Sequence, residues 1–474
     1  MEKDNVEEET DSFSVWYHKI LEDTQIIDLR YPVKGMLVYR GWGMKIIREM
    51  SDFLTKLLEQ NGHEPLSMPV LIPENLLFKE SEHIAGFEEQ VFWVTHAGKN
   101  ELDEKLALRP TSETPLYEMF KLWIRSHQDL PFRIHHPSAV YRYETKHTRP
   151  LIRGREFLWN EGHTAYPSRE TLMQNYEDIT RIYTALISDL LCLKFQLNKR
   201  PEWDKFPGAD ATYAFDIIMP DGKTLQCATW HNLGQHFSKV FNLTYEDEKG
   251  EHQHPYQSSY APSFGRLLAA LVCINSDDRG LVLPPRIAPI QVVIVPILYK
   301  KADDEETLRY AKEIEKKLQS FNLRTHLDVS DERPGARYYF WEMKGVPLRI
   351  EIGPRDMKEK KVTVVRRDTL KKEQIAISEL SSKRLEDLFS DIEKNLKERT
   401  EKKFKEMQFT AKNLEELKKY LGKGIITTGW CGDMKCAAEI DKLGASFLSV
   451  VDEEPSTCVI CGKKGKEIRV AKSY

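Results

Sequence analysis

The segment Tyr141–His163, YRYETKHTRPLIRGREFLWNEGH, is the part of the chain from which the fold can be inferred. It is predicted to begin as a strand, in which Arg142 and Glu144 point to one face because side chains alternate along a strand. A loop follows that is rich in cationic side chains: Lys146, His147, Arg149, Arg153 and Arg155. The returning strand carries Phe157, Trp159, Glu161 and His163.

The cations of this predicted hairpin favour a site for a polyphosphate. Arginine suits phosphate because its planar guanidinium donates two parallel hydrogen bonds. Glu144 can accept a hydrogen bond from an exocyclic amine while Arg142 binds an anionic oxygen. A surface hairpin with an ordinary ion pair is the alternative interpretation.

The hairpin resembles motif 2 of the class II aminoacyl-tRNA synthetases, which reads R-x-E, a variable loop and R-x-x-x-F. The longer run RYETKHTRPLIRGREFLWNEGHTAY is similar to prolyl-tRNA synthetases in particular. The resemblance implies that Arg142 neutralises charge at the α-phosphate of ATP and at the amino-acid carboxylate. It implies that Arg153 holds the outer phosphates and that Glu144 holds the adenine amine. It also places Phe157 in the ATP site and Trp159, Glu161 and His163 in a proline pocket.

Composition limits the classes of protein that remain. At 474 residues the chain is too long for one hydrophobic core, so roughly two to four domains are expected. The net charge of -4 indicates no general affinity for nucleic acid, so RNA contacts must come from local basic patches and no DNA partner is expected. The N-terminus MEKDNVEEET lacks the apolar segment of a signal peptide, and the longest apolar run, 287–298, is too short to span a membrane. A cytoplasmic protein without a membrane partner is predicted.

The segments before the hairpin also follow a recognisable order. Residues 1–12 are expected to form a disordered acidic tail. Apolar residues in 44–60 recur at the spacing of an amphipathic helix, which Gly62 is placed to end, and a strand is predicted over 63–73. This unit is either an ordinary helix and strand or, by its resemblance to class II motif 1, the interface of a homodimer. The segment 76–94 is predicted to be either a solvated loop or, by the same resemblance, one that closes over the amino acid.

The run LALRPTSETP, residues 106–115, predicts a binding site for an amine. Thr111 and Glu113 can each accept a hydrogen bond from a protonated secondary amine, and Glu113 also balances its charge. A helix cap is the alternative, with the helix running to Ile124. Threonyl-tRNA synthetases share RPTSET but need a cysteine soon after the motif 2 arginine. No cysteine follows Arg142 until Cys192, which argues against threonine.

Two later segments complete the predicted site. A hairpin is expected over 214–229, and the run LQCATWHNLGQ implies, by resemblance, that Gln226 and Thr229 contact ATP and His231 the proline pocket. Their spacing does not place all three on one strand face, so the strand must bend. Arg266 is predicted at the start of a helix, where the helix dipole also favours phosphate, and it corresponds to the arginine of motif 3. The sequence departs from the family pattern at Trp230, a large indole that could narrow or reshape the site, and at Tyr260, Ala261, Pro262 and Phe264.

Residues 287–396 are predicted to be a second domain. Strands and helices alternate there, which indicates a mixed or parallel α/β sheet. The segment resembles the anticodon-binding domain of class II synthetases, in which Glu342, Arg349 and Arg355 are candidates for reading anticodon bases. Ordinary surface charges are the alternative for each of the three.

The last domain, residues 397–474, carries two cysteine pairs, Cys431 with Cys436 and Cys458 with Cys461. Two such knuckles about twenty residues apart predict a closed, structural Zn²⁺ site, against the alternative of free buried thiols. The resembling archaeal-type enzymes carry such a domain and often end in a tyrosine whose carboxylate reaches toward the active site. This chain ends in Tyr474.

Together these features predict an α/β protein with three folded domains. Residues 13–286 form an α+β catalytic domain, an antiparallel sheet flanked by helices, followed by an α/β anticodon-binding domain and a small α/β zinc domain. The resemblance implies ligation of L-proline to tRNA(Pro) through a prolyl-adenylate, with ATP and Mg²⁺ and with Arg142 and Arg266 as catalytic residues. About a hundred residues separate motifs 2 and 3, too few for the large editing domain of the bacterial form. The alternatives are a paralogue that binds tRNA or an amino acid without catalysis, and a ligase for another small amino acid.

Overall fold

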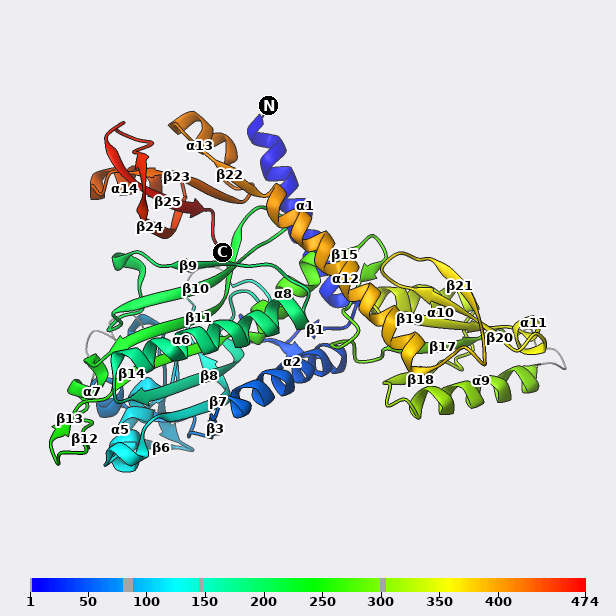
Figure 1. The fold of residues 1–474 in the computed structure, drawn as a ribbon, viewed down its shortest axis with the longest axis horizontal. Coiled ribbons are helices and arrows are strands. Elements are labelled where there is room, and N and C mark those ends of the chain that lie inside the picture. Colours follow the sequence, from blue (N-terminus) through cyan, green and yellow to red (C-terminus); the bar gives the residue numbers. More distant parts are fainter. Residues whose placement is uncertain (1, 80–87, 145–147, 299–303) are drawn as a thin grey trace.

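The fold was obtained as a computed structural model, which describes residues 2–79, 88–144, 148–298 and 304–474 (Figure 1). The N-terminal domain is built on a seven-stranded sheet in the order β3-β7-β8-β14-β11-β10-β9. Its strands are β3 (Glu64–Pro65), β7 (Phe132–Tyr141), β8 (Glu156–Tyr166), β9 (Gln196–Lys199), β10 (Ala211–Ile218), β11 (Thr224–Gly234) and β14 (Tyr256–Pro262). Every neighbouring pair is antiparallel except β3 and β7. The antiparallel sheet predicted for this domain is therefore present.

Helices cover one face of this sheet (Figure 1). They are α2 (Gly41–Gln60), α6 (Arg169–Thr184), which continues as a π-helical turn (Ala185–Leu190), and α8 (Phe264–Ile274). The predicted helix over 44–60 is confirmed as α2: Ile46, Met50 and Leu54 are fully buried in the core against α8 and the sheet. The helix ends at Gln60, and Gly62, two residues beyond, has a positive φ of 80° that suits a residue without a side chain.

Shorter elements surround the sheet. They are β1 (Ile27–Asp28), β2 (Val38–Tyr39), β4 (Leu71–Pro73), α3 (Glu74–Leu77), β5 (Phe92–Ala97), β6 (Asn100–Leu108), α5 (Glu113–Trp123), α7 (His236–Val240), β12 (Tyr245–Glu246), β13 (His252–Gln253), β15 (Ser276–Asp277) and β16 (Gly280–Leu281). The predicted strand over 63–73 is two strands in different sheets, since β3 pairs with β7 and β4 pairs with β6. The part of the predicted closing loop at 80–87 lies outside the described residues.

Two predictions for local structure differ from the fold. Helix α1 (Glu2–Asp23) includes residues 2–12, for which a disordered tail was predicted. Strand β7 ends at Tyr141, so the prediction that Arg142 and Glu144 share a strand face is wrong. The Tyr143 backbone N–H donates to the Gln90 carbonyl, 2.7 Å away, which draws the chain off the β7–β8 ladder.

The middle domain has a five-stranded sheet in the order β18-β17-β19-β20-β21. Its elements are β17 (Val292–Pro296), α9 (Asp304–Gln319), β18 (Thr325–Leu327), α10 (Pro334–Met343), β19 (Leu348–Ile352), α11 (Pro354–Lys358), β20 (Lys361–Arg366) and β21 (Lys372–Ala376). Strands β18, β17 and β19 are parallel, whereas β20 and β21 are antiparallel. This confirms the predicted mixed sheet.

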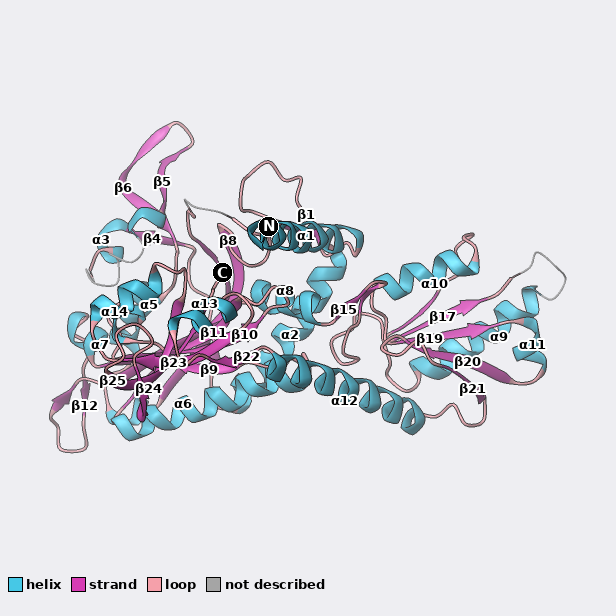
Figure 2. Ribbon diagram, turned by 90° about the horizontal axis from the view of Figure 1, so that it is seen from above, coloured by secondary structure: helices cyan, strands magenta, loops and turns pink. Residues whose placement is uncertain are grey.

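The C-terminal domain has a four-stranded sheet in the order β22-β23-β25-β24. Its elements are β22 (Gln408–Thr410), α13 (Leu414–Tyr420), β23 (Ile425–Trp430), α14 (Met434–Asp441), β24 (Ser446–Thr457) and β25 (Lys464–Ala471). The long helix α12 (Ser382–Glu406) joins it to the middle domain (Figure 2). Leu396 packs in the core of the middle domain, whereas Phe404 packs against residues of the other two domains. Among the described residues, no helix has the length and apolar character that crossing a membrane requires.

Candidate active site

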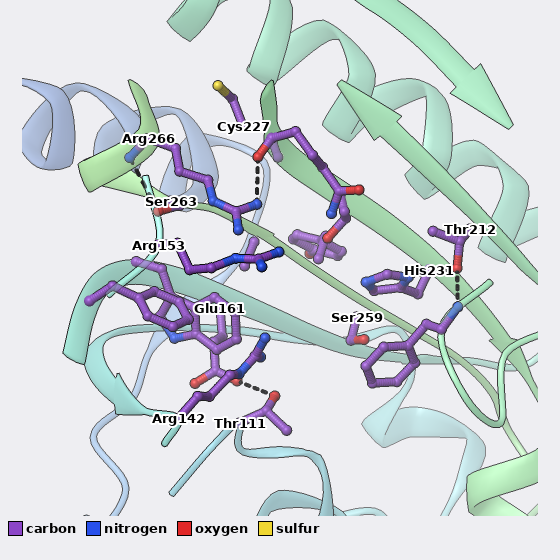
Figure 3. A pocket seen from close by; sticks show the side chains of 18 of the residues that line it. Thr111, Arg142, Arg153, Glu161, Thr212, Cys227, His231, Ser259, Ser263 and Arg266 are labelled. Carbon is purple, nitrogen blue, oxygen red and sulfur yellow. Dashed lines mark hydrogen bonds between the residues drawn. The ribbon is translucent and has the colours of Figure 1, made fainter. Parts of the chain in front are cut away.

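The site lies in the N-terminal domain, in a cavity of about 360 Å³ between the β7–β8 hairpin, strand β11 and the start of α8 (Figure 3). The predicted site residues that line it are Thr111, Glu113, Arg142, Glu144, Arg153, Phe157, Trp159, Glu161, His163, Gln226, Thr229, His231 and Arg266. The structure thus brings together every residue predicted for the ATP site and the proline pocket. Phe206 and Pro207, which precede β10, also line the cavity.

Arg142 occupies the floor of the cavity. Its guanidinium lies over the rings of Phe157 and Trp159, 5.3 and 5.4 Å from their centroids, and its Nε donates to the Pro110 carbonyl over 3.1 Å. Burial, helped by the charge of Arg266, lowers the pKa of Arg142 to about 10. The side chain therefore stays cationic at neutral pH, in a setting of low dielectric where its charge acts strongly on an anion.

Arg153 and Arg266 form a second cationic group on the far side of the cavity (Figure 3). Arg266 Nε donates to the Ile152 carbonyl over 3.0 Å, and Nη1 donates to the Gln226 carbonyl over 2.8 Å. These two contacts fix the guanidinium across the start of α8, whose N-terminus Ser263 caps. Burial lowers the pKa of Arg266. Two guanidiniums beside a helix N-terminus, that of Arg266 fixed by hydrogen bonds, are suited to bind a chain of phosphates.

The opposite end of the cavity carries a buried carboxylate cluster. Glu161 Oε2 accepts hydrogen bonds from the Ser112 backbone N–H at 2.9 Å and from Thr111 Oγ1 at 3.2 Å, while Ser112 Oγ donates to Oε1 at 2.7 Å. His163 Nε2 lies 3.3 Å from Oε2, and Thr111 also donates to Glu113. Burial alone raises the pKa of Glu161, but His163 and Ser112 outweigh it and hold that pKa below its usual range. Ser112 precedes α5 without capping it through its side chain, so the alternative of a Thr-Ser-Glu helix cap is wrong.

Strand β11 bends as its spacing required. Ala228 pairs with Phe215 and Gln226 pairs with Asp216, so Cys227 is an extra residue in a β-bulge. Gln226, Thr229 and His231 consequently all line the cavity. The His231 ring stacks on Phe206 at 4.5 Å, and its Nδ1 lies 2.9 Å from Thr212 Oγ1.

Two of the bulky departures from the family pattern, Trp230 and Phe264, lie outside the cavity lining. Trp230 is fully buried behind the sheet, where its Nε1 donates to Asn175 Oδ1 of α6 over 2.9 Å and its ring meets Tyr176. Phe264 is buried in the same core. Neither lines the cavity among the described residues, so the expectation that Trp230 narrows the site is wrong. The bulge at Cys227 lets Gln226 face the cavity together with Thr229 and His231, whereas Trp230 faces the core.

The three residues predicted to read the anticodon do not form one group. Arg349 and Glu342 are buried and paired, with Nη1 2.7 Å from Glu342 Oε1, and Arg349 also pairs with Glu351. The side chain of Arg355 is 90% exposed on α11 and pairs with Glu359 at 2.9 Å. Only Arg355 is thus presented openly to a partner among these three.

The four C-terminal cysteines meet as predicted. Their Sγ atoms all lie within 4.8 Å of one another, and those of Cys431 and Cys461 are 3.6 Å apart. A tetrahedral Zn²⁺ with Zn–S bonds of about 2.3 Å separates its sulfurs by about 3.8 Å, so the cluster fits that ion. Four thiolates leave no open position for a substrate, which makes a structural role the appropriate one.

The terminal Tyr474 docks on the N-terminal domain. Its backbone N–H donates to the Thr224 carbonyl at the start of β11, and its hydroxyl donates to Asp221 Oδ2 over 2.6 Å. The Arg149 guanidinium lies 5.0 Å from the centre of its ring. Tyr474 therefore packs behind the motif 2 loop and is not among the described residues that line the cavity.

Some functional residues were not found from the sequence. Ser112 was overlooked because Thr-Ser-Glu also reads as a cap. Ser259 and Tyr260 line the cavity from β14, which pairs with β11 and β8.

The fold and the site define a class II aminoacyl-tRNA synthetase. Residues 92–275 match the family model of the tRNA synthetase class II core domain (G, H, P, S and T), and residues 291–387 match the anticodon binding domain. Residues 414–474 match the C-terminal domain of prolyl-tRNA synthetase. The chain belongs to the prolyl-tRNA synthetase family.

Relatives support this assignment over the full length. The proline–tRNA ligases of Methanopyrus kandleri and Pyrococcus abyssi are each 46% identical to it, over 469 and 477 residues. Both alignments span 98% of this chain, with 96% and 98% of the respective relative. A solved structure, the Giardia lamblia prolyl-tRNA synthetase in complex with prolyl-adenylate, matches with a TM-score of 0.93 and 36% identity, covering 98% of both chains.

Proposed function

We propose that the chain ligates L-proline to tRNA(Pro), first by forming prolyl-adenylate from proline and ATP and then by transferring the prolyl group to the tRNA. The observation that carries this is the cavity, with paired cationic groups at one end and a buried carboxylate cluster at the other. The curated relatives named proline–tRNA ligase and the neighbour bound to prolyl-adenylate support the same substrates.

The two ends of the cavity divide the substrates between them. Thr111 and Glu113 accept hydrogen bonds from the proline NH₂⁺ group, and Trp159, Glu161, His163 and His231 shape the pocket around its ring. Arg142 lies between the two ends and neutralises the proline carboxylate and the α-phosphate as they approach. Arg153 and Arg266 hold the outer phosphates, while Glu144, Phe157, Gln226 and Thr229 hold the nucleoside.

In the first step a carboxylate oxygen of proline attacks the α-phosphorus, and the bond to the leaving pyrophosphate breaks. No side chain has to exchange a proton in this step, because the nucleophile is already an anion. The chain therefore contributes position and charge: Arg142 balances the crowded negative oxygens, and the held Arg266 does not have to reorganise. In the second step the terminal ribose hydroxyl of the tRNA attacks the activated carbonyl, and AMP leaves.

Metal ions, assembly and location extend the proposal. Mg²⁺ accompanies the triphosphate, which it binds largely through phosphate oxygens. Zn²⁺ is held by Cys431, Cys436, Cys458 and Cys461 in a structural role.

We also propose a cytoplasmic homodimer that pairs through α2 and the strands that follow it. The domain boundaries at 286 and 396 and an anticodon-reading role for Glu342, Arg349 and Arg355 stand as further proposals. Arg355 has the most accessible side chain of these three.

Amino-acid-dependent exchange of pyrophosphate into ATP tests the adenylation step. All twenty amino acids are compared, with Arg142→Ala as the control that removes the central charge. We expect proline to give the highest exchange and the control to lose at least about 10³-fold. No exchange from folded protein would favour a paralogue that only binds, and a higher rate with another amino acid would favour a different ligase. Alanine and cysteine are no larger than proline, so weak exchange with both is expected at high concentration.

A further inference from the structure

The C-terminal domain touches a segment that forms one wall of the active-site cavity. This segment, residues 200–207, connects β9 to β10 and includes a short 3-10 helix, Glu202–Asp204. Asp204, Lys205, Phe206 and Pro207 line the cavity. Arg200 and Trp203, which precede them, contact the C-terminal domain instead. This short segment therefore lies between the cavity and the C-terminal domain.

Arg200 is the first contact point. Its side chain is 6% exposed and forms a two-fold pair with Asp216: Nη1 donates to Oδ2 and Nη2 to Oδ1, each over 2.7 Å. Nη1 also donates to the Leu448 carbonyl of β24 over 3.1 Å, and Nη2 donates to Gln226 Oε1 over 2.9 Å. One buried guanidinium therefore joins the C-terminal domain to a residue of the ATP site.

The contact with Arg200 decides how the Gln226 amide is oriented. Arginine has only donors, so the Gln226 atom that faces it must be the oxygen. The NH₂ group is then the part of the amide left to donate to a ligand in the cavity. The backbone carbonyl of Gln226 already accepts a hydrogen bond from Arg266. The backbone oxygen and the side-chain oxygen of Gln226 are thus each bonded to an arginine.

Trp203 is the second contact point. Its ring meets those of Trp430 and Phe447 in the C-terminal domain, at centroid distances of 5.3 and 5.5 Å and nearly perpendicular angles. Trp430 immediately precedes Cys431, and its Nε1 donates to the Asp433 carbonyl inside the Cys431–Cys436 knuckle. Trp203, the neighbour of Asp204 in the chain, therefore packs against the loop that carries Cys431 and Cys436.

We propose that Arg200 is a positioning residue for ATP: it presents the Gln226 amide as a donor to the nucleotide, and the C-terminal domain, through Leu448 and Trp430, keeps the 200–207 wall in place. The inference rests on the proposed function of the cavity. Because Gln226 contacts the nucleotide before and during reaction alike, the loss of its orientation weakens ATP binding more than it slows the chemistry.

Arg200→Lys tests the proposal, since lysine keeps the charge beside Asp216 but lacks the planar fork. The matched control is Arg367→Lys, which alters a buried two-fold arginine pair with Asp277 between the other two domains, away from the cavity. We expect Arg200→Lys to raise the KM for ATP in pyrophosphate exchange by about tenfold, with the KM for proline and kcat within about twofold. Arg367→Lys is expected to leave the KM for ATP unchanged. A rise below about fivefold, or an equal rise for proline, overturns the proposal.

Trp203→Ala tests the contact with the C-terminal domain without removing a buried charge. Trp123→Ala is its control: Trp123 is similarly exposed and also meets two rings, but it lies at the end of α5 and does not line the cavity. We expect Trp203→Ala alone to weaken binding of a non-hydrolysable ATP analogue, by at least about threefold in titration calorimetry. If Trp203→Ala and Trp123→Ala bind the ATP analogue with equal affinity, the proposed role of the C-terminal domain is overturned. The same comparison tests the proposal if Arg200→Lys does not fold. The titration measures binding and needs no turnover. If the wild-type protein showed no proline-dependent exchange, the proposed function would be contradicted, but the titration could still test the role of Trp203.

Discussion

Glu161 shows how a single side chain serves both folding and binding. It receives hydrogen bonds from Thr111 and twice from Ser112, and it lies beside His163. In Glu161→Gln one carboxylate oxygen becomes an NH₂ group, which cannot accept from these donors. We expect the variant to lose about 1–3 kcal/mol of stability in chemical unfolding and to raise the KM for proline. Glu101→Gln, on the exposed strand β6, is the control and should change neither quantity.

The pH dependence of stability gives an independent check on Glu161. The pKa of its carboxyl group is lowered in the folded protein from the usual 4.5 to about 2, because hydrogen bonds and charge from His163 and Ser112 outweigh burial. A lowered folded pKa means that the carboxylate stabilises the fold fully above pH 4.5, and that this contribution is lost as the pH falls toward about 2. The difference in unfolding free energy between wild type and Glu161→Gln should therefore shrink across this window. A constant difference would contradict the ionised carboxylate.

Residue identities in the cavity could be predicted from the sequence, but their connections could not. Arg142, Arg266 and Thr111 lie in short runs with a specific pattern, and each reached the cavity. Arg200 lies in no such run, because its role depends on Asp216 and Leu448, which are distant in sequence and meet it only in the folded chain. Ion pairs of this kind are set by tertiary packing rather than by local pattern.

At the scale of elements, strand β11 determines which of its side chains reach the substrate. Its alternation is broken at Cys227, and that one extra residue brings Gln226 to the cavity side together with Thr229 and His231, while Trp230 faces the core. The sequence predicted that the strand bends but not which residue forms the bulge, since a bulge depends on pairing with β10. Beyond the bulge the alternation is regular, and it puts Trp230 on the face opposite Thr229 and His231, away from the cavity.

Trp230→Ala follows from this arrangement of β11. The substitution removes a fully buried indole and leaves Asn175 without its donor, so a loss of about 3–5 kcal/mol in unfolding free energy is expected. The KM values for proline and ATP should remain within about twofold, because the side chain faces away from the cavity. Unfolding in denaturant and exchange kinetics on the same preparation measure both. Altered substrate preference with intact stability would mean that the indole reaches the site after all.

The helix at 44–60 and the alternation of strands and helices in the middle domain were the most predictable parts of the fold. Segment 44–60 carries a long apolar stripe, and the middle domain alternates strands and helices in a regular way, so local pattern was sufficient there. The end of β7 was not predictable, because the chain leaves the ladder at a hydrogen bond from Tyr143 to Gln90, in a different part of the domain.

At the scale of the whole molecule, three cores are joined by a few buried contacts. Lys344 of the middle domain donates to the Thr24 carbonyl and to Gln25 Oε1, at 2.6 and 3.0 Å, which ties it to the end of α1. Burial lowers the pKa of Lys344 to about 8. The C-terminal domain is tied to the cavity wall by Arg200 and Trp203. The domains therefore affect one another through specific side chains as well as through α12.

The small size of the C-terminal domain makes its stability depend on the metal that we propose for it. Its core is the smallest of the three, and a single core in a domain of roughly 80 residues or fewer supplies little stability without such a cross-link. We expect one Zn²⁺ per chain by atomic absorption in wild type and in the control Cys192→Ser, whose thiol is buried outside the cluster. Cys436→Ser should lose most of the metal and unfold in a separate, earlier thermal transition.

Removal of Zn²⁺ by a chelator should destabilise the C-terminal domain as Cys436→Ser does, and should also affect the active-site cavity. When the Cys431–Cys436 loop loosens, Trp430 no longer supports Trp203, and the wall of the cavity is less constrained. The KM for ATP is then expected to rise in the chelated protein while the middle domain stays folded, because its core contains no metal ligand among the described residues. Added Zn²⁺ should restore the wild-type value. A chelated protein that keeps its single thermal transition and its KM would show that the four thiols hold the domain without a metal.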